Sequence, residues 1–183
     1  VIRLAQKGYQ EVVLTGIHLS SYGVDFKDSD HNLLSLIQSI HQVDGITRIR
    51  LGSLEPRITT EEFVQTLSGL WKVCPHFHLS LQSGCQETLE RMNRRYTADE
   101  YREKCQILRK YYENPALTTD VIVGFPQESL EEFRESYEFV KEIQFYETHI
   151  FKYSRRKGTK ADKMEGQIPE QEKTRRSEQM IAL

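Results

Sequence analysis

The chain has 183 residues, of which 38% are hydrophobic, so it can bury an ordinary core and is not a disordered tail. Its 25 lysines and arginines nearly balance 27 aspartates and glutamates, so any contact with nucleic acid must come from local basic patches. No apolar run approaches the roughly 20 residues that span a bilayer, and the N-terminus lacks the order of a secretory signal. The sequence therefore predicts a cytoplasmic protein with no membrane partner, and it leaves the oligomeric state open.

The three cysteines, Cys74, Cys85 and Cys105, are odd in number, and their spacings match no zinc motif. Nothing else points to an oxidising compartment, so we interpret them as reduced structural thiols. The histidines His76 and His78 project from one face of an expected strand, but no third ligand stands at a telling spacing. The sequence predicts no metal site within this chain.

Strands and helices alternate along the chain. Val1–Lys7 reads as an amphipathic helix capped by Gly8, so we expect the chain to begin inside a larger protein. Apolar and β-branched runs then predict five strands, of which the first suits burial on both faces. They are Glu11–Thr15, Ile46–Leu51, Phe77–Leu81, Leu117–Val123 and Glu147–Phe151.

Helices are expected between the strands, from apolar residues at helical spacing and from capping boxes. The boxes are Thr59-x-x-Glu62, Thr97-x-x-Glu100 and Ser129-x-x-Glu132. Further helices are expected at about Asn32–Gln42, through Leu89 and Met92, and from Pro169 onward.

This alternation predicts an α/β fold with a parallel sheet and right-handed crossovers. A complete (β/α)8 barrel needs roughly 250 residues, more than are present. We expect a partial TIM-type barrel of about five parallel strands at residues 1–160. Residues 161–183 are expected to form a C-terminal helical segment that leads out of the core. A doubly wound open sheet is the alternative.

Small and polar residues gather in the loops after the strands, where a barrel builds its active site. Gly16 lets a ligand approach the backbone, although a plain turn also uses glycine. Glu55, with Ser53, can accept hydrogen bonds from an ammonium group, or it is an ordinary surface acid. Gln82 and Ser83 suit ribose hydroxyls, although turn chemistry looks similar.

An acid, Asp120, lies inside an expected apolar strand. Its burial is costly without a partner, so we expect it to be hydrogen-bonded or to face a site. Val123 and Phe125 can flank a flat adenine ring, although core packing explains them as well.

Two basic clusters, Arg91–Arg95 and Lys152–Lys160, each include or adjoin a tyrosine. Arginine beside an aromatic ring can meet the phosphates and stacked bases of RNA. Solvated surface is the competing interpretation.

Together these segments resemble the methylthiotransferase branch of the radical S-adenosylmethionine (SAM) family over nearly the whole chain. The resemblance rests on five ordered motifs. They are Leu14-Thr15-Gly16-Ile17-His18 with Tyr22-Gly23; Ser53-Leu54-Glu55-Pro56; His78-Leu79-Ser80-Leu81-Gln82-Ser83-Gly84 with Leu89, Arg91-Met92 and Arg94; Thr119-Asp120-Val121-Ile122-Val123-Gly124-Phe125-Pro126; and Phe151-x-Tyr153-Ser154-x-Arg156-x-Gly158-Thr159.

Within that branch, Thr15-Gly16-Ile17-His18 is similar to the subgroup that acts on N6-threonylcarbamoyladenosine beside the tRNA anticodon. Relatives that act on isopentenyladenosine usually carry Gly-Gln-Asn-Val there, and a third relative modifies a ribosomal protein. The resemblance therefore implies addition of a methylthio group to C2 of the threonylcarbamoyladenosine base, with the tRNA anticodon loop as partner.

The resemblance also implies cofactors. Such enzymes bind SAM and [4Fe-4S] clusters, one of them held by a Cys-x3-Cys-x2-Cys loop after the first strand of the barrel. The three cysteines here do not match that motif. We expect the cluster ligands to lie upstream of Val1, and the chain alone to be inactive.

Carried over by position, the resemblance assigns roles to residues of this chain. Gly16 receives the methionine amino group of SAM, and Ser53 and Glu55 line the same pocket. Gln82 and Ser83 approach the ribose or the carboxylate. The other assigned residues are Asp120 as a pocket residue, Val123 and Phe125 beside adenine, Phe151 at the far wall, and Arg94, Arg156 and Lys157 for RNA or the SAM carboxylate.

The chain departs from the family pattern after the fourth expected strand. The family usually reads Gly-Phe-Pro-Gly-Glu-Thr, and here Gln127 replaces a glycine and Ser129 replaces the threonine. If that glycine has positive φ, the loop is strained or rearranged. Ser129 still serves as a helix N-cap.

Two readings outside this family remain. One is a barrel lyase or hydrolase that uses Glu55 and Asp120 as an acid–base pair. The other is a non-catalytic RNA-binding module that works through the basic clusters.

Overall fold

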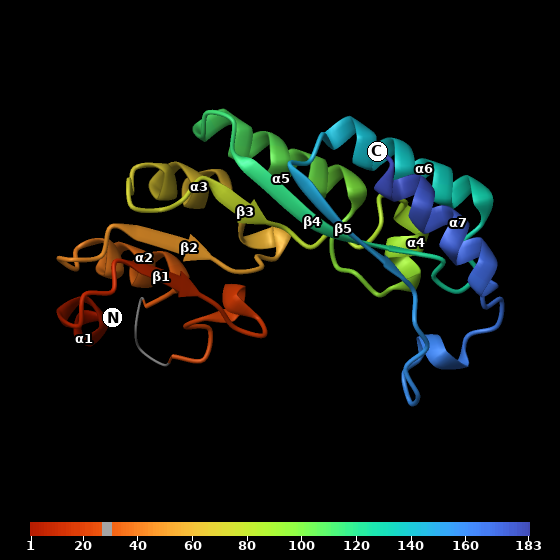
Figure 1. Ribbon diagram of the computed structural model, residues 1–183, viewed down its shortest axis with the longest axis horizontal. Helices are drawn as coiled ribbons and strands as arrows, with labels where there is room; N and C mark the ends of the chain where they lie inside the picture. The colour runs from red at the N-terminus through yellow and green to blue at the C-terminus, as the bar shows by residue number, and fades with distance from the viewer. Residues whose placement is uncertain (27–30) are drawn as a thin grey trace. The chain divides into compact units, whose positions relative to one another are not determined.

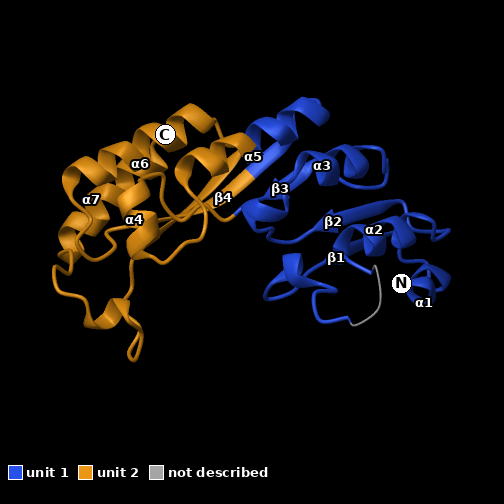
Figure 2. Cartoon of the chain, turned by 180° about the vertical axis from the view of Figure 1, so that it is seen from behind, with its two compact units in different colours: residues 1–79, 104–117 blue, residues 80–103, 118–183 orange. Residues whose placement is uncertain are grey.

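Figure 1 shows the computed structural model, which describes residues 1–26 and 31–183. The chain divides into two compact units, coloured separately in Figure 2. Unit 1 comprises residues 1–79 and 104–117, and unit 2 comprises residues 80–103 and 118–183. The boundary passes through helix α5 (Ala98–Tyr111) and strand β4 (Ala116–Val123). Within the described residues, none of the helices has the length and apolarity needed to cross a bilayer.

In unit 1, strand β1 (Glu11–Leu14) pairs in parallel with β2 (Arg48–Leu51). The register places Val12 opposite Ile49. Single parallel bridges from Ile49 to Val73 and from Leu54 to Leu79 extend the pairing on either side of β3 (His76–His78). Successive strands of this unit therefore lie side by side in the same direction.

The helices of this unit are α1 (Ile2–Gln6), α2 (Leu33–His41), α3 (Glu61–Ser68) and the part of α5 from Lys104 onward. Helix α2 begins at Asn32, whose Oδ1 accepts the N–H of Ser35 at 3.0 Å. The Ser35 hydroxyl in turn accepts the N–H of Asn32 at 2.9 Å, which completes a capping box. The apolar face of α2 is buried, so it supplies part of the core of unit 1.

In unit 2, β4 pairs in parallel with β5 (Glu147–Lys152). The register runs from Thr118 opposite Glu147 to Val123 opposite Lys152. The helices are α4 (Gln86–Arg91), the first residues of α5, α6 (Leu130–Ile143) and α7 (Glu170–Ile181). The buried residues of this core include Leu81, Leu89, Tyr101, Val121, Phe133, Phe139, Val140 and Met180.

The predicted α/β fold with parallel strands and alternating helices is confirmed, and each predicted strand has a counterpart among β1 to β5. The third strand is shorter than expected, because its pairing after His78 is reduced to single bridges at Leu79 and Gln82. The division at residue 160 into a core and an outgoing segment stays a prediction.

Two of the three predicted capping boxes are confirmed, those at Thr97 and Ser129. The third is wrong by one residue. Thr60 is the N-cap of α3, and its hydroxyl accepts the N–H of Phe63 at 3.2 Å. Thr59 is buried, and its hydroxyl has no hydrogen-bond partner among the described residues. Two adjacent threonines compete for one cap, and the backbone selects the second.

The expectation that the first strand is buried on both faces is also wrong for this chain. Val12 is 8% exposed, whereas Val13, on the opposite face, is 56% exposed. Alternate residues of a strand point to opposite faces, so only one face of β1 is packed within the described residues.

The loop after β4 accommodates the Gln127 substitution with left-handed backbone. Gln127 has φ +66, which is the conformation that the usual glycine would adopt without steric cost. Its N–H donates to the carbonyl of Gly166 at 2.8 Å, which anchors the strained residue. Ser129 caps α6 as expected.

Candidate functional site

In unit 1, the loops after β1 and β2 meet through side chains. Nε2 of His18 lies 3.0 Å from Oε1 of Glu55, and about half of each side chain is exposed. The N–H of Glu55 donates to the hydroxyl of Ser20 at 3.0 Å. Glu55 is thus tied to the first loop. Its partners His18 and Ser20 were given no role from the sequence, because only the fold brings the two loops together.

Gly16 stands in the same loop, and its geometry bears on why it is glycine. Gly16 is not among the residues with positive φ. A Cβ built on it would have no neighbour closer than 3.8 Å, which is ordinary van der Waals contact. The turn itself therefore does not require glycine, and the assignment of Gly16 to ligand approach stays a prediction. Ser53 is exposed in the neighbouring loop.

Among the cavities of unit 2 is one of about 510 Å³ beside β4 and β5, which we call the unit 2 cavity. Its size is in the range of small-molecule sites. Gln82, Asp120 and Ile122 line it from the β4 side. The rest of the lining comes from β5 and the segment after it: Phe151, Lys152, Tyr153, Ser154, Arg156, Thr159 and Ala161.

Gln82 is held beside β4 in an unusual conformation. Its N–H donates to the carbonyl of Asp120 and its carbonyl accepts the N–H of Ile122, both at 2.8 Å. Its φ is +72, a value that non-glycine residues rarely adopt. Such strain persists only where the surroundings impose it, and it gathers at functional sites. The left-handed backbone of Gln82 is therefore a feature of the cavity lining that is typical of functional sites.

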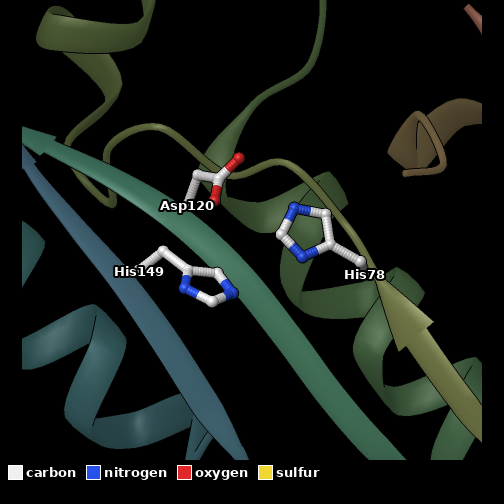
Figure 3. Close-up of side chains that lie close together, drawn as sticks. All are labelled: His78, Asp120 and His149. Carbon is white, nitrogen blue, oxygen red and sulfur yellow. The ribbon is translucent and has the colours of Figure 1, made fainter. Parts of the chain in front are cut away.

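Asp120 lies opposite His149 in the register of β4 and β5, and Figure 3 shows both side chains on their neighbouring strands. Nitrogen of His149 and carboxylate oxygen of Asp120 lie within 4.8 Å. The third residue drawn there, His78, belongs to unit 1. Asp120 lines the unit 2 cavity, which agrees with the expectation that an acid in this strand is partnered or faces a site.

Three of the unit 2 residues assigned to SAM from the sequence do not line the cavity. Val123 is 1% exposed and Phe125 is 7% exposed, and Ser83 is fully buried. The ring of Phe125 packs edge-on against Tyr153, with centroids 5.2 Å apart. Strand alternation places Ile122, and not Val123, on the face of Asp120.

The basic residues assigned to RNA all lie at the surface of unit 2. Arg156 lines the cavity, whereas Lys157 and Arg94 are exposed elsewhere. The N–H of Arg94 closes the end of α4 by donating to the carbonyl of Leu89 at 2.9 Å. Of these three residues, Arg156 is the one that lines the unit 2 cavity, and their contact with RNA stays a prediction.

All three cysteines are free thiols. Burial raises the pKa of Cys85 and of Cys105 to about 12 and also raises the pKa of Cys74. Iron–sulfur clusters need thiolates. Among the described residues, no group of metal-ligating side chains contains more than one cysteine. These thiols do not fit a [4Fe-4S] cluster.

The alternative acid–base pair divides between the units, with Glu55 in unit 1 and Asp120 in unit 2. Each has a histidine beside it, His18 for Glu55 and His149 for Asp120. The pair stays a hypothesis.

Comparison with curated proteins finds tRNA-modifying enzymes. Threonylcarbamoyladenosine tRNA methylthiotransferase MtaB of Bacillus subtilis (strain 168) is 43% identical over 182 residues, covering 99% of this chain and 40% of that protein. tRNA-2-methylthio-N(6)-dimethylallyladenosine synthase of Thermoanaerobacter sp. (strain X514) is 39% identical over 183 residues, covering 100% of this chain and 39% of that protein. The chain thus spans about 40% of the length of these relatives.

Comparison with solved structures agrees on the fold. The radical S-adenosylmethionine methyltransferase TsrM from Kitasatospora setae matches with a TM-score of 0.65 at 18% identity. The match covers 85% of this chain and 30% of that one. A family model, the Radical SAM superfamily, matches residues 1–140, well over half of the chain. This chain belongs to the radical SAM superfamily.

Proposed function

We propose that this chain is the SAM-binding part of a radical SAM methylthiotransferase. The proposed reaction adds a methylthio group to C2 of N6-threonylcarbamoyladenosine in the tRNA anticodon loop. Family membership and the relatives named for tRNA methylthiotransfer support the reaction. The unit 2 cavity is the observation that supports binding of SAM by this chain. The proposed place of action is the cytoplasm, because the substrate is tRNA.

The unit 2 cavity offers groups that match an adenosyl ligand. The side chains of Gln82 and Asp120 can accept hydrogen bonds from ribose hydroxyls. Phe151, which is 53% exposed, and Ile122 offer apolar surface to adenine. Arg156 can pair with a carboxylate. When bound, SAM supplies the 5′-deoxyadenosyl group and the methyl group.

The buried residues assigned to SAM have a supporting role in this proposal. Ser83 accepts the N–H of Cys85 at 3.2 Å and so orders the turn that follows Gln82. Val123 accepts the N–H of Tyr153 through its carbonyl at 2.9 Å, and the Phe125 ring packs on that tyrosine. They hold cavity residues in place without touching the ligand.

For the loops of unit 1 we propose recognition of an ammonium group, such as that of a methionine moiety. The Glu55 carboxylate provides the charge, and its tie to Ser20 fixes its backbone. Gly16 allows close approach to the main chain, and Ser53 adds a hydroxyl in reach of solvent. This assignment explains a glycine that the turn does not need.

For RNA we propose contacts through Arg156, Lys157 and Arg94. All three are exposed, and guanidinium groups bind phosphates at two points. We assign a [4Fe-4S] cluster no ligand among Cys74, Cys85 and Cys105, because these thiols are separate and two are fully buried.

The experiment that tests the proposal identifies the product nucleoside. A bacterial strain without methylthiotransferases is complemented with the full-length protein that contains this chain, and its tRNA nucleosides are analysed by mass spectrometry. The proposal expects 2-methylthio-N6-threonylcarbamoyladenosine. Accumulation of 2-methylthio-dimethylallyladenosine instead would favour the second group of relatives, which are 36–40% identical. Absence of both products would contradict the proposal.

A further inference from the structure

Helix α7 contacts the end of β5 and the residue after it, which form one wall of the unit 2 cavity. Nζ of Lys173 donates to the carbonyl of Tyr153 at 3.0 Å and lies 5.5 Å from the centre of the Tyr153 ring. The N–H of Tyr153 donates to the carbonyl of Val123 on β4 at 2.9 Å. The main chain of Tyr153 is therefore held between β4 on one side and α7 on the other.

The residue before it is held by the same helix. Nζ of Lys152 lies 2.5 Å from Oε1 of Glu170 and 3.3 Å from the hydroxyl of Thr174. Glu170, Lys173 and Thr174 share one face of α7, because residues three and four apart are neighbours on a helix. Two consecutive residues of the cavity wall thus depend on one helix face.

The cost of placing Lys173 there indicates that its position matters. Its side chain is only 8% exposed, and lysine is seldom buried without partners. Here the partners of Nζ are the carbonyl of Tyr153 and the carboxylate of Glu170, 3.6 Å away. Its stem passes directly over Gly124, where an added Cβ would overlap Cγ of Lys173. The chain leaves room for this side chain by having glycine at φ +72. An apolar residue would fill the same space without the burial of a charge.

We propose that Lys173 is a positioning residue for the unit 2 cavity. Its ammonium fixes the carbonyl of Tyr153 and so sets the path of residues 152–156, which carry Lys152, Tyr153, Ser154 and Arg156 into the lining. The identity of the ligand rests on the proposed function, whereas the fixing of this segment does not. Helix α7 then positions the lining of the unit 2 cavity without forming part of that lining.

The test compares Lys173→Met with Lys141→Met in the 183-residue chain. Methionine keeps the stem over Gly124 and removes the ammonium. Lys141, on α6, is an exposed lysine whose ammonium lies 3.7 Å from the carboxylate of Glu138, so it serves as the control. Amide hydrogen exchange is measured by NMR, and S-adenosylhomocysteine binding is measured by calorimetry.

In Lys173→Met we expect amide exchange in residues 152–156 to accelerate about tenfold, with exchange in α6 unchanged. The dissociation constant for S-adenosylhomocysteine should rise about fivefold to twentyfold. Lys141→Met should leave both unchanged, and Lys173→Arg should recover most of the loss, because arginine keeps a donor for the Tyr153 carbonyl.

Unchanged exchange in residues 152–156 would overturn the proposal, whether or not the ligand binds. A uniform acceleration over the whole of unit 2 would also overturn it, because that result indicates a general role in stability. If the wild-type chain fails to bind the probe, the proposed function fails, and the exchange data still decide the role of Lys173.

A second variant keeps the proposal testable if Lys173→Met does not fold. Glu170→Gln changes a side chain that is 65% exposed, and it removes the carboxylate that pairs with both Lys152 and Lys173 while leaving both ammonium groups in place. We expect faster exchange at residues 152 and 153 in this variant as well. Exchange equal to that of the wild type would contradict the anchoring of this segment by α7.

Discussion

Nη1 of Arg176 lies 2.5 Å from Oε2 of Glu128, and only 5% and 2% of these two side chains are exposed. The same carboxylate oxygen accepts the N–H of Gly124 at 2.7 Å. Burial raises the pKa of Glu128, while the hydrogen bonds from Arg176 and Gly124 act in the opposite direction. The loop after β4 and helix α7 therefore share one buried ion pair.

Removal of one partner of this pair should be strongly destabilising. In Arg176→Met the Glu128 carboxylate loses its cation, and we expect a loss of about 3–5 kcal/mol in the free energy of unfolding. Urea denaturation measures it. The loss should shrink as the pH falls, because protonation removes the unpaired charge. Arg175→Met is the control, since Arg175 is an exposed partner of Glu172. Equal losses in the two variants would contradict this account.

Glu172 should contribute to acid sensitivity. Hydrogen bonds from Arg175 and Arg176 lower its pKa from 4.5 to about 2. Because the folded-state pKa is the lower one, the stabilisation is present above pH 4.5 and is lost as the pH falls toward 2. As the pH is lowered between these values, the midpoint temperature of thermal unfolding should fall less steeply in Glu172→Gln than in the wild type. Parallel curves would refute this role.

Replacement of the strained loop residue Gln127 by glycine should stabilise the chain. Gln127→Gly removes a left-handed non-glycine residue, and we expect a gain of about 0.5–1 kcal/mol in unfolding free energy. Gln144, at φ +54 after α6, provides a matched site for Gln144→Gly. A loss at Gln127 together with a gain at Gln144 would show that the side-chain hydrogen bond from Gln127 to the carbonyl of Glu165 outweighs the strain.

Two glycines in the site loops should differ in their tolerance of alanine. A Cβ on Gly84 would lie 2.5 Å from Cβ of Phe139, so Gly84→Ala should destabilise the chain by about 1–3 kcal/mol. Gly16→Ala should change unfolding free energy by less than about 0.5 kcal/mol, because its Cβ meets only ordinary contacts. Equal destabilisation by the two substitutions, in urea titrations, would contradict the assignment of Gly16 to ligand approach.

The order of strands and helices could be predicted from the sequence because each element is encoded locally. The capping boxes at Thr97 and Ser129 need only residues three apart. The box at Thr59 failed because the next residue is also threonine, and the choice between them depends on the path of the preceding turn.

The site could be predicted only in part, because it depends on contacts between distant segments. Alternation along β4 could have identified Ile122 in place of Val123, since Asp120 fixes the face. No local pattern could reveal that Gln82 has positive φ, because this conformation accompanies two main-chain hydrogen bonds with β4, which is distant in the sequence. Nor could it reveal Lys173, which reaches the cavity wall from 20 residues farther along the chain.

Calorimetry of S-adenosylhomocysteine with Phe151→Ala tests most directly whether the unit 2 cavity binds an adenosyl ligand. Phe151 lines the cavity and is 53% exposed, whereas Tyr146, 76% exposed, lies outside its lining and provides the control variant Tyr146→Ala. Loss of a ring that packs on adenine should raise the dissociation constant about tenfold in Phe151→Ala, with wild-type affinity in Tyr146→Ala. Wild-type affinity in Phe151→Ala would contradict the claim.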